Sequence, residues 1–156
     1  MTGRIKLRDM TPADVDAVLH IEQQVHGHPW TRGMFSDALA NGYICKIVEE
    51  GGEIAGYVVL MPALDEVHLL DISIAGKFQR KGLGEKLLGE MLTLARERKF
   101  ERMILEVRRS NLAAGALYRK LGFGEIGVRR GYYPKNNGRA ENSEREDAIV
   151  MECKLE

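Results

Sequence analysis

The spacing of apolar and polar residues in the first half of the chain predicts short strands interrupted by two helices. Four runs have the alternation or the β-branched composition of strands, and they lie at residues 4–8, 43–49, 54–61 and 66–74. Helical spacing occurs at residues 11–25, where Thr11 and Pro12 form a helix start, and again at residues 31–41. The turn at residues 50–53, with its two glycines, favours an antiparallel hairpin.

The apolar residues change to a helical period after Gly84. One face of this helix contains Leu87, Leu88, Met91, Leu92 and Ala95. The helix is expected to end near Lys99. A mostly apolar run at residues 103–107 has the length of a strand, and a second helical face follows at residues 114–121 and ends at Gly122. Because a strand, a helix and a strand follow one another here, we expect a parallel crossover.

The last part of the chain predicts two more strands, at residues 124–130 and 147–155. Between them, residues 135–146 form a polar stretch rich in Asn, Glu and Arg, which we expect to be a mobile loop. Strands and helices therefore alternate in mixed order. The expected fold class is α/β or α+β with a mixed sheet.

Length and charge restrict the classes of function. The 156 residues correspond to one ordinary domain, so we expect a single domain over residues 1–156. Lys plus Arg and Asp plus Glu both number 23, so the chain has no net positive charge that would attract it to nucleic acid or to an anionic membrane. Cys45 and Cys153 lack a metal-ligand or disulfide spacing. With no signal-peptide core and no run of roughly eighteen apolar residues, the chain is expected to be cytoplasmic.

The segment Gln79-Arg80-Lys81-Gly82-Leu83-Gly84 lies between a predicted strand and a predicted helix. Its glycines allow the backbone to approach a ligand, the helix start offers unpaired N–H groups, and two basic side chains add charge, so a pyrophosphate would be bound well here. The segment lacks the GK[ST] of a Walker A loop, and Leu87 replaces the third glycine of GxGxxG. On the hexapeptide alone, a glycine-rich turn with solvated basic residues remains the alternative.

Two side chains have the chemistry that acid–base catalysis requires. Glu106 interrupts the apolar strand at residues 103–107, where a charge must pair or have a raised pKa. It is therefore either a general base or a glutamate paired with Arg108 or Arg109. Tyr118 shares the apolar face of its helix, so the alternative to a catalytic phenol is a core tyrosine with a hydrogen-bonded hydroxyl.

Asn111 stands where a helix N-cap is expected, and a second role as a ligand contact is possible. The four histidines, at positions 20, 26, 28 and 68, do not have the spacing of a metal site, and no acidic or cysteine ligand accompanies them in sequence. We therefore assign the histidines no chemistry and expect no metal.

Several motifs together resemble the GNAT acetyltransferases, and among them the bacterial RimI group of ribosomal-protein alanine N-acetyltransferases. These motifs are DISI at 71–74, QRKGLG at 79–84 and ILEVRRSNLAAGALYRKLGF at 104–123. The segments at residues 26–30, 129–134 and 146–151 are also similar to RimI, so the resemblance covers nearly the whole chain. It implies a mostly antiparallel sheet of about seven strands flanked by about four helices.

The resemblance also implies roles for individual residues. Glu106 would be the general base, Tyr118 the general acid and Asn111 a cofactor contact. The implied acetyl-CoA sites are Ile72, Ser73 and Ile74, together with Arg80, Lys81, Gly82, Leu83, Gly84 and Glu85. In such folds the strand that contains Ile72–Ile74 splays from its neighbour, so its free backbone groups bind pantetheine and polarise the thioester.

The implied acceptor is the N-terminal alanine of small-subunit ribosomal protein eighteen. The stretch between Pro134 and Asp147 is longer than in the RimI sequences, which puts substrate selection in doubt because loops at the mouth of a site choose the peptide. Three alternatives remain open: a GNAT enzyme acting on lysine side chains or small amines, a CoA-binding regulatory module without turnover, and a nucleotide-binding protein. The sequence does not determine the oligomeric state.

Overall fold

The computed structural model describes residues 5–134 and 145–155. The strands in these residues form one seven-stranded sheet with the order β1-β2-β3-β4-β5-β7-β6. The strands are β1 (Ile5–Asp9), β2 (Ile44–Glu50), β3 (Glu53–Ala63), β4 (Glu66–Ile74), β5 (Arg102–Arg108), β6 (Gly124–Pro134) and β7 (Arg145–Lys154). The α-helices of the described residues are α1 (Val15–Val25), α2 (Arg32–Ala40), α3 (Leu83–Glu97) and α4 (Leu112–Lys120). Single 3-10 turns occur at Pro12–Asp14 and Gly76–Phe78. The predicted mixed fold class is confirmed.

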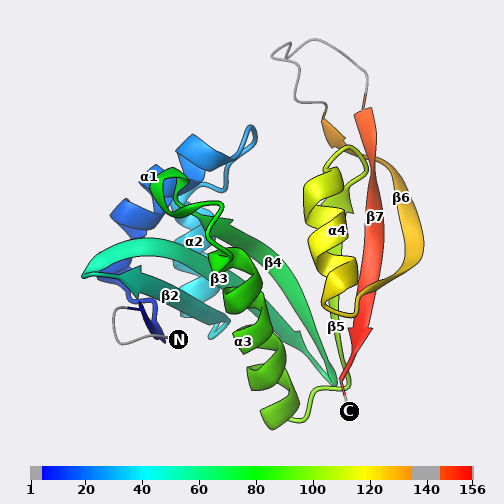
Figure 1. Cartoon of the computed structure of the whole chain (residues 1–156), viewed down its shortest axis with the longest axis horizontal. Helices are drawn as coiled ribbons and strands as arrows, with labels where there is room; N and C mark the ends of the chain where they lie inside the picture. Colours follow the sequence, from blue (N-terminus) through cyan, green and yellow to red (C-terminus); the bar gives the residue numbers. More distant parts are fainter. Residues whose placement is uncertain (1–4, 135–144, 156) are drawn as a thin grey trace.

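The centre of the sheet contains its one parallel pair, β4 and β5, and α3 connects them, so the predicted crossover is confirmed. The other neighbouring strands are antiparallel. The β4–β5 pairing covers only three residue pairs, from Glu66↔Arg102 to His68↔Ile104. Beyond them the strands diverge, and the sheet opens as a V whose arms separate toward the top of Figure 1. This divergence creates the space in which the site lies.

Apolar side chains alternate along the strands and therefore form a core on each face of the sheet. On one face Leu87 and Met91 of α3 pack with Leu105 of β5 in the larger cluster. On the other face the cluster joins α1 and α2 to the sheet, and Phe35 contacts the ring of Tyr57 edge-on with a centroid distance of 5.9 Å. Burial on both faces fixes the sheet between two helical layers.

The observed element bounds differ from the predicted ones mainly near residue 135. Strand β6 continues to Pro134, further than the expected end at residue 130. Of the stretch predicted to be a mobile loop, residues 135–144 lie outside the described residues. Arg145 and Glu146 belong to β7, so for these two the loop prediction is wrong. The reason is that Tyr133 and Pro134 pair with Glu146 and Arg145 and extend the β6–β7 ladder.

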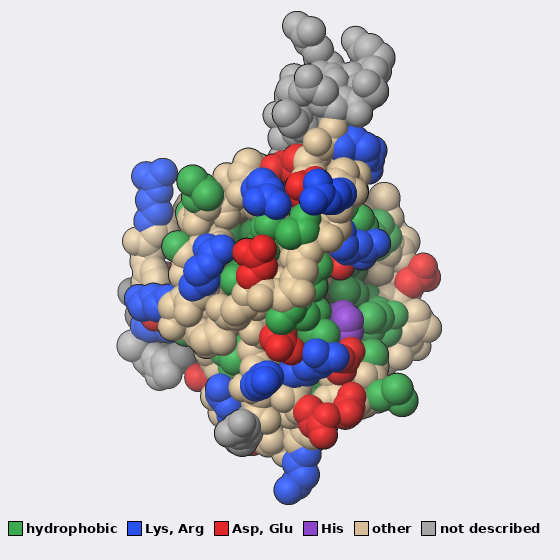
Figure 2. Space-filling model, turned by 90° about the vertical axis from the view of Figure 1, so that its right-hand side faces the viewer, with side chains coloured by type: hydrophobic (Ala, Val, Ile, Leu, Met, Phe, Trp, Pro, Cys, Tyr) green, Lys and Arg blue, Asp and Glu red, His purple; other side chains and the backbone are tan. Residues whose placement is uncertain are grey.

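None of the helices in the described residues has the length and apolar character needed to cross a membrane. Figure 2 shows Lys and Arg side chains interspersed with Asp and Glu on the face that includes α4. This distribution agrees with the balanced charge of the sequence.

A network around Asp14 ties the start of the first helical segment to β1. The two carboxylate oxygens of Asp14 accept hydrogen bonds from Arg8 at 2.8 and 2.9 Å, and one of them also accepts from the backbone N–H of Thr11 at 2.8 Å. The Arg8 guanidinium is the main cause that lowers the pKa of Asp14 to about 2. The interaction therefore requires an ionised carboxylate.

Asp14→Asn is expected to lower the free energy of unfolding by about 1–2 kcal/mol at pH 7, a value reduced by the partial exposure of Arg8. Since the folded pKa lies below the unfolded value of about 3.9, this stabilisation is fully present above pH 4 and is lost as the pH falls toward 2. Urea unfolding of both proteins at pH 7 and near pH 2.5 measures the difference. An equal penalty at both pH values would contradict the assignment.

Candidate active site

A cavity of about 340 Å³ lies where β4 and β5 diverge. Strand β4 contributes residues 69–72 to its wall, and β5 contributes residues 105–108. The remaining wall comes from the end of α1 with the loop that follows it, from α4 and from β6. Four of the predicted site residues, Ile72, Glu106, Asn111 and Tyr118, therefore line one space.

Glu106 lies on β5, and its side chain is 26% exposed. The guanidinium of Arg129, on β6, donates to Glu106 Oε1 at 2.8 Å. The prediction that a pairing partner would be Arg108 or Arg109 is wrong. Those arginines instead pair with Glu146 and Asp147, since β7 brings both carboxylates beside the end of β5. The pair with Arg129 keeps the Glu106 carboxylate oriented at the wall of the cavity.

Tyr118 projects from α4 to the cavity and packs against Phe123 with a ring-centroid distance of 5.8 Å. Burial, together with the charge of Asp71, raises the pKa of Tyr118 to about 12. The phenol is therefore protonated at neutral pH and can donate a proton or a hydrogen bond. Asn111 caps α4, because its Oδ1 accepts from the backbone N–H of Ala114 at 3.2 Å. The predicted N-cap is confirmed.

The end of β4 has one free edge. Residues 72–74 pair with β3 on one side, but the β4–β5 ladder within the described chain stops at His68. The side chain of Ser73 is buried and contacts Asp71 and His26, and neither Ser73 nor Ile74 lines the cavity, whose β4 wall ends at Ile72. The Ile74 carbonyl accepts from Gln79 Nε2 at 2.8 Å. The predicted splaying of this strand is confirmed.

The predicted glycine-rich turn does lead into a helix. Gly82 is the N-cap residue of α3 and has φ of +78°, a left-handed conformation that favours glycine. The side chain of Leu83 is buried, so a ligand would meet its backbone N–H. Glu85 pairs with Lys120 at 2.9 Å, and the ammonium of Lys81 lies 5.7 Å from the ring centroid of Phe78. No side chain of the described residues caps the start of α3, so the N–H groups of its first turn can bind a ligand.

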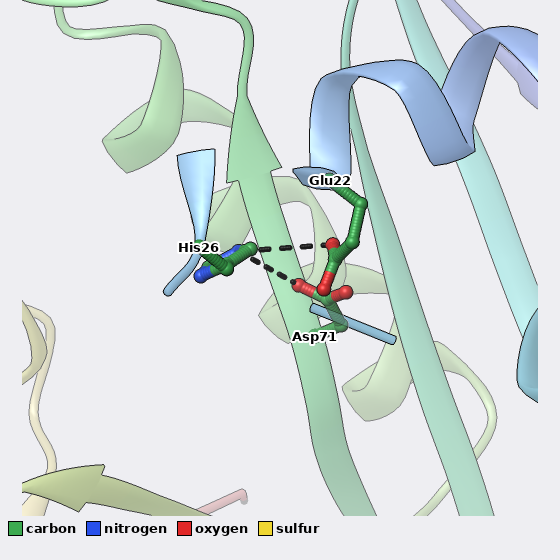
Figure 3. Close-up of side chains that lie close together, drawn as sticks. All are labelled: Glu22, His26 and Asp71. Atoms are coloured by element: carbon green, nitrogen blue, oxygen red, sulfur yellow. Dashed lines mark ion pairs between the residues drawn. The ribbon is translucent and has the colours of Figure 1, made fainter. Parts of the chain in front are cut away.

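The structure adds three site residues that sequence reasoning missed, namely Glu22, His26 and Asp71. Figure 3 shows their side chains converging from the end of α1, from the residue after it and from β4. His26 Nε2 lies 3.7 Å from Glu22 Oε1 and 3.6 Å from Asp71 Oδ1, and 2.7 Å from the hydroxyl of Ser73. The conclusion that the histidines have no chemistry is therefore not supported for His26.

The electrostatics of this cluster are unusual. Burial, a hydrogen bond with the Asp71 carboxyl and the charge of Asp71 raise the pKa of Glu22 to about 7. Hydrogen bonding to Asp71 raises the pKa of His26. A sequence signal existed, because Glu22 occupies an apolar face of α1 beside Val18 and Ile21. A charge on such a face must be paired or have a function.

Comparisons with known proteins agree with this geometry. The model of the acetyltransferase (GNAT) family matches residues 15–123. The [ribosomal protein bS18]-alanine N-acetyltransferase of Escherichia coli K12 is 37% identical over 145 residues, which cover 93% of this chain and 94% of that protein. The crystal structure of the ribosomal-protein-S18-alanine N-acetyltransferase from E. coli superposes with a TM-score of 0.89 at 35% identity, covering 97% and 94% of the two chains.

A more distant solved structure shares the fold. It is a GNAT family acetyltransferase from Elizabethkingia anophelis with acetyl-CoA bound, 21% identical, with a TM-score of 0.77 and coverage of 99% and 100%. The sheet that splits between β4 and β5, the turn before α3 and the matched residues lead to one assignment. The chain belongs to the acetyltransferase (GNAT) family.

Proposed function

We propose that the protein transfers the acetyl group of acetyl-CoA to the N-terminal α-amino group of a protein, and that the acceptor is the N-terminal alanine of ribosomal protein bS18. One observation carries the proposal: the cavity between β4 and β5 is lined by both a carboxylate, Glu106, and a protonated phenol, Tyr118. The E. coli relative supports the acceptor, since its similarity covers 93% of the chain. A ribosomal acceptor would imply a cytoplasmic enzyme.

Acetyl-CoA would lie along the free edge of β4 with its pyrophosphate at the start of α3. The backbone of residues 72–74 would bind the pantetheine and polarise the thioester carbonyl, which matches a strand end without a partner on the β5 side within the described chain. Residues 80–85 would hold the pyrophosphate, since N–H groups at a helix start and nearby basic side chains favour an anion. Asn111 would contact the cofactor from the cavity wall.

Glu106 would accept the proton that the attacking amine loses. An α-amino group, with a pKa of about 7.7 to 8.0, is roughly two and a half units more acidic than the lysine ammonium. At about 1.36 kcal/mol per unit, the difference is roughly 3.5 kcal/mol, so a carboxylate is a sufficient base for this acceptor. The amine nitrogen then forms a bond to the carbonyl carbon.

Tyr118 would act in the second half of the reaction. When the tetrahedral intermediate collapses, the carbon–sulfur bond breaks and the electron pair goes to sulfur. The phenol, which holds its proton at neutral pH, donates it to the departing thiolate. The tyrosinate then regains a proton before the next turnover. The products are the acetylated N-terminus and free CoA.

Tyr118→Phe is expected to lower kcat by about 100-fold while the affinity for acetyl-CoA changes by less than about twofold. Tyr133 also lines the cavity, and burial raises its pKa to about 12, so Tyr133→Phe is the matched control. Steady-state kinetics and a binding titration measure both quantities. Equal losses in turnover and affinity, or a larger loss in kcat for Tyr133→Phe, would contradict the acid role of Tyr118.

The acceptor is tested by mass spectrometry. An alanine-starting peptide with the N-terminal sequence of bS18 is incubated with acetyl-CoA and enzyme, beside an N-blocked peptide that contains lysine. Acetylation of the free N-terminus alone is the expected result. Modification of the lysine peptide alone would indicate a side-chain acetyltransferase, and CoA binding without any transfer would indicate a regulatory module.

A further inference from the structure

Asp71 presents an unsatisfied charge to the cavity. Its side chain lies on β4 and is buried, with 8% exposure. Asp71 Oδ1 accepts from the hydroxyl of Ser73 at 2.9 Å. Among the buried side-chain polar atoms of the described residues, Asp71 Oδ2 is the one without a hydrogen-bond partner. A buried carboxylate oxygen without a donor is costly, and this cost applies whenever the neighbouring Glu22 is ionised and has no proton to donate to Asp71.

A second buried carboxylate, that of Glu22, increases the cost. Glu22 is only 2% exposed, and its oxygens accept from the Tyr57 hydroxyl at 2.8 Å and from the Trp30 backbone N–H at 3.0 Å. With a pKa of about 7, Glu22 is protonated in part of the molecules at neutral pH and then hydrogen-bonds to Asp71. When Glu22 is ionised, its own hydrogen bonds are provided by the fold, whereas those of Asp71 are incomplete. Both carboxylates line the cavity that Glu106 lines from β5.

We propose that Asp71, supported by Glu22 and His26, forms a subsite that binds the cationic α-ammonium group of the acceptor N-terminus. An ammonium has three N–H donors, one of which would satisfy Asp71 Oδ2, and its positive charge would reduce the repulsion between the two carboxylates. The inference rests on the proposed function and names the residues that hold the acceptor before its proton leaves. Asp71 is a binding and positioning residue here.

Other charged groups around the cluster fit a monovalent cation. Tyr57 on β3 and Tyr118 on α4 are neutral at physiological pH, because burial raises both pKa values. Arg108 on β5 acts on His26 electrostatically but pairs with Glu146. Glu22 Oε1 accepts from Tyr57, His26 Nε2 contacts Ser73, and Asp71 Oδ2 has no donor, so one additional N–H donor would complete the hydrogen bonds of the cluster. The three side chains also lie close enough together to hold a metal ion, and Zn²⁺ binding is therefore one outcome of the test.

The test compares two peptide amides that differ only at the first residue, one starting with alanine and the other with a propionyl group, which lacks the amine. Each is titrated by calorimetry into enzyme saturated with CoA, so no transfer occurs. The wild-type enzyme is expected to prefer the amine peptide by about 10-fold or more. In Asp71→Asn the preference is expected to disappear, with the affinity for CoA unchanged within about twofold.

Asp71→Asn is suited to this test because its amide oxygen can still accept from Ser73, and the new N–H₂ removes the unpaired oxygen. The melting temperature is therefore expected to stay equal or rise while acceptor binding falls, which a purely structural role would not produce. Asp65→Asn, in the exposed turn before β4, is the matched control and should keep the wild-type preference. In steady state the KM for the peptide should rise and the KM for acetyl-CoA should not.

Three results would overturn the inference: equal binding of both peptides by the wild-type enzyme, a retained preference in Asp71→Asn, or stoichiometric Zn²⁺ binding that Asp71→Asn abolishes. The binding measurement does not depend on turnover. If the wild-type enzyme acetylates no N-terminus, the proposed function fails, and the amine preference still decides whether the subsite exists. If N-termini are acetylated but the preference survives in Asp71→Asn, only the subsite fails.

Discussion

Glu106→Gln is expected to lower kcat/KM for the alanine-starting peptide by about 1,000-fold, the middle of the range for a lost general base. The glutamine oxygen can still accept from Arg129 in place of Glu106 Oε1, so the position of the side chain is retained and only its basicity is lost. Binding of acetyl-CoA should change by less than about twofold. Steady-state kinetics with both substrates varied give the two values.

Glu152→Gln is the matched control for this experiment. Glu152 is also a half-buried strand glutamate paired with an arginine, since Arg102 donates to it at 2.9 Å, but it does not line the cavity. Loss of an ion pair by itself should therefore leave kcat/KM near the wild-type value. If Glu106→Gln keeps more than about a third of wild-type kcat/KM, a different group is the base.

Gly56→Ala is expected to lower the free energy of unfolding by about 3 kcal/mol, because the added methyl group has no space. A Cβ at Gly56 would lie 2.5 Å from the Ser73 carbonyl oxygen and 2.6 Å from Ile74 Cδ1. The first contact is with backbone, so β3 and the end of β4 must move apart. Activity should fall as well, since this part of β4 is the proposed acetyl-CoA strand.

Gly89→Ala provides the control for the glycine substitution. Gly89 lies inside α3, and a Cβ there meets no atom within 4 Å. The change should stabilise the protein by up to about 1 kcal/mol, because alanine favours a helix more than glycine does. Urea unfolding of both variants gives the two values. A Gly56→Ala protein within about 1 kcal/mol of wild type would show that the close approach of β3 to β4 relaxes easily.

Much of the fold follows from local sequence signals. The glycine turn at residues 50–53 predicts the β2–β3 hairpin, and the helical period after Gly84 predicts α3. Asn111 predicts the start of α4 through its capping preference. Each of these signals acts between residues a few positions apart. For that reason they can be read without knowledge of the tertiary structure.

The candidate site was only partly predictable, because its contacts join distant residues. His26 and Ser73 are 47 positions apart and meet across two layers, and Arg129 reaches Glu106 from 23 positions away. No periodicity encodes such pairs. The parting of β4 from β5 was expected only from the resemblance to the GNAT family, since both strands have the composition of ordinary strands and their composition does not give the length of the ladder.

The short β4–β5 ladder also has a mechanical consequence. Two half-sheets, β1 to β4 and β5 with β7 and β6, are joined through three residue pairs, so the seam between them is the weakest line of the sheet. A molecule bound between the diverging ends of β4 and β5 would contact both half-sheets. Because it binds the folded state, its binding free energy would stabilise the sheet across this boundary, and the centre of the molecule would be stiffer with the site occupied than with it empty.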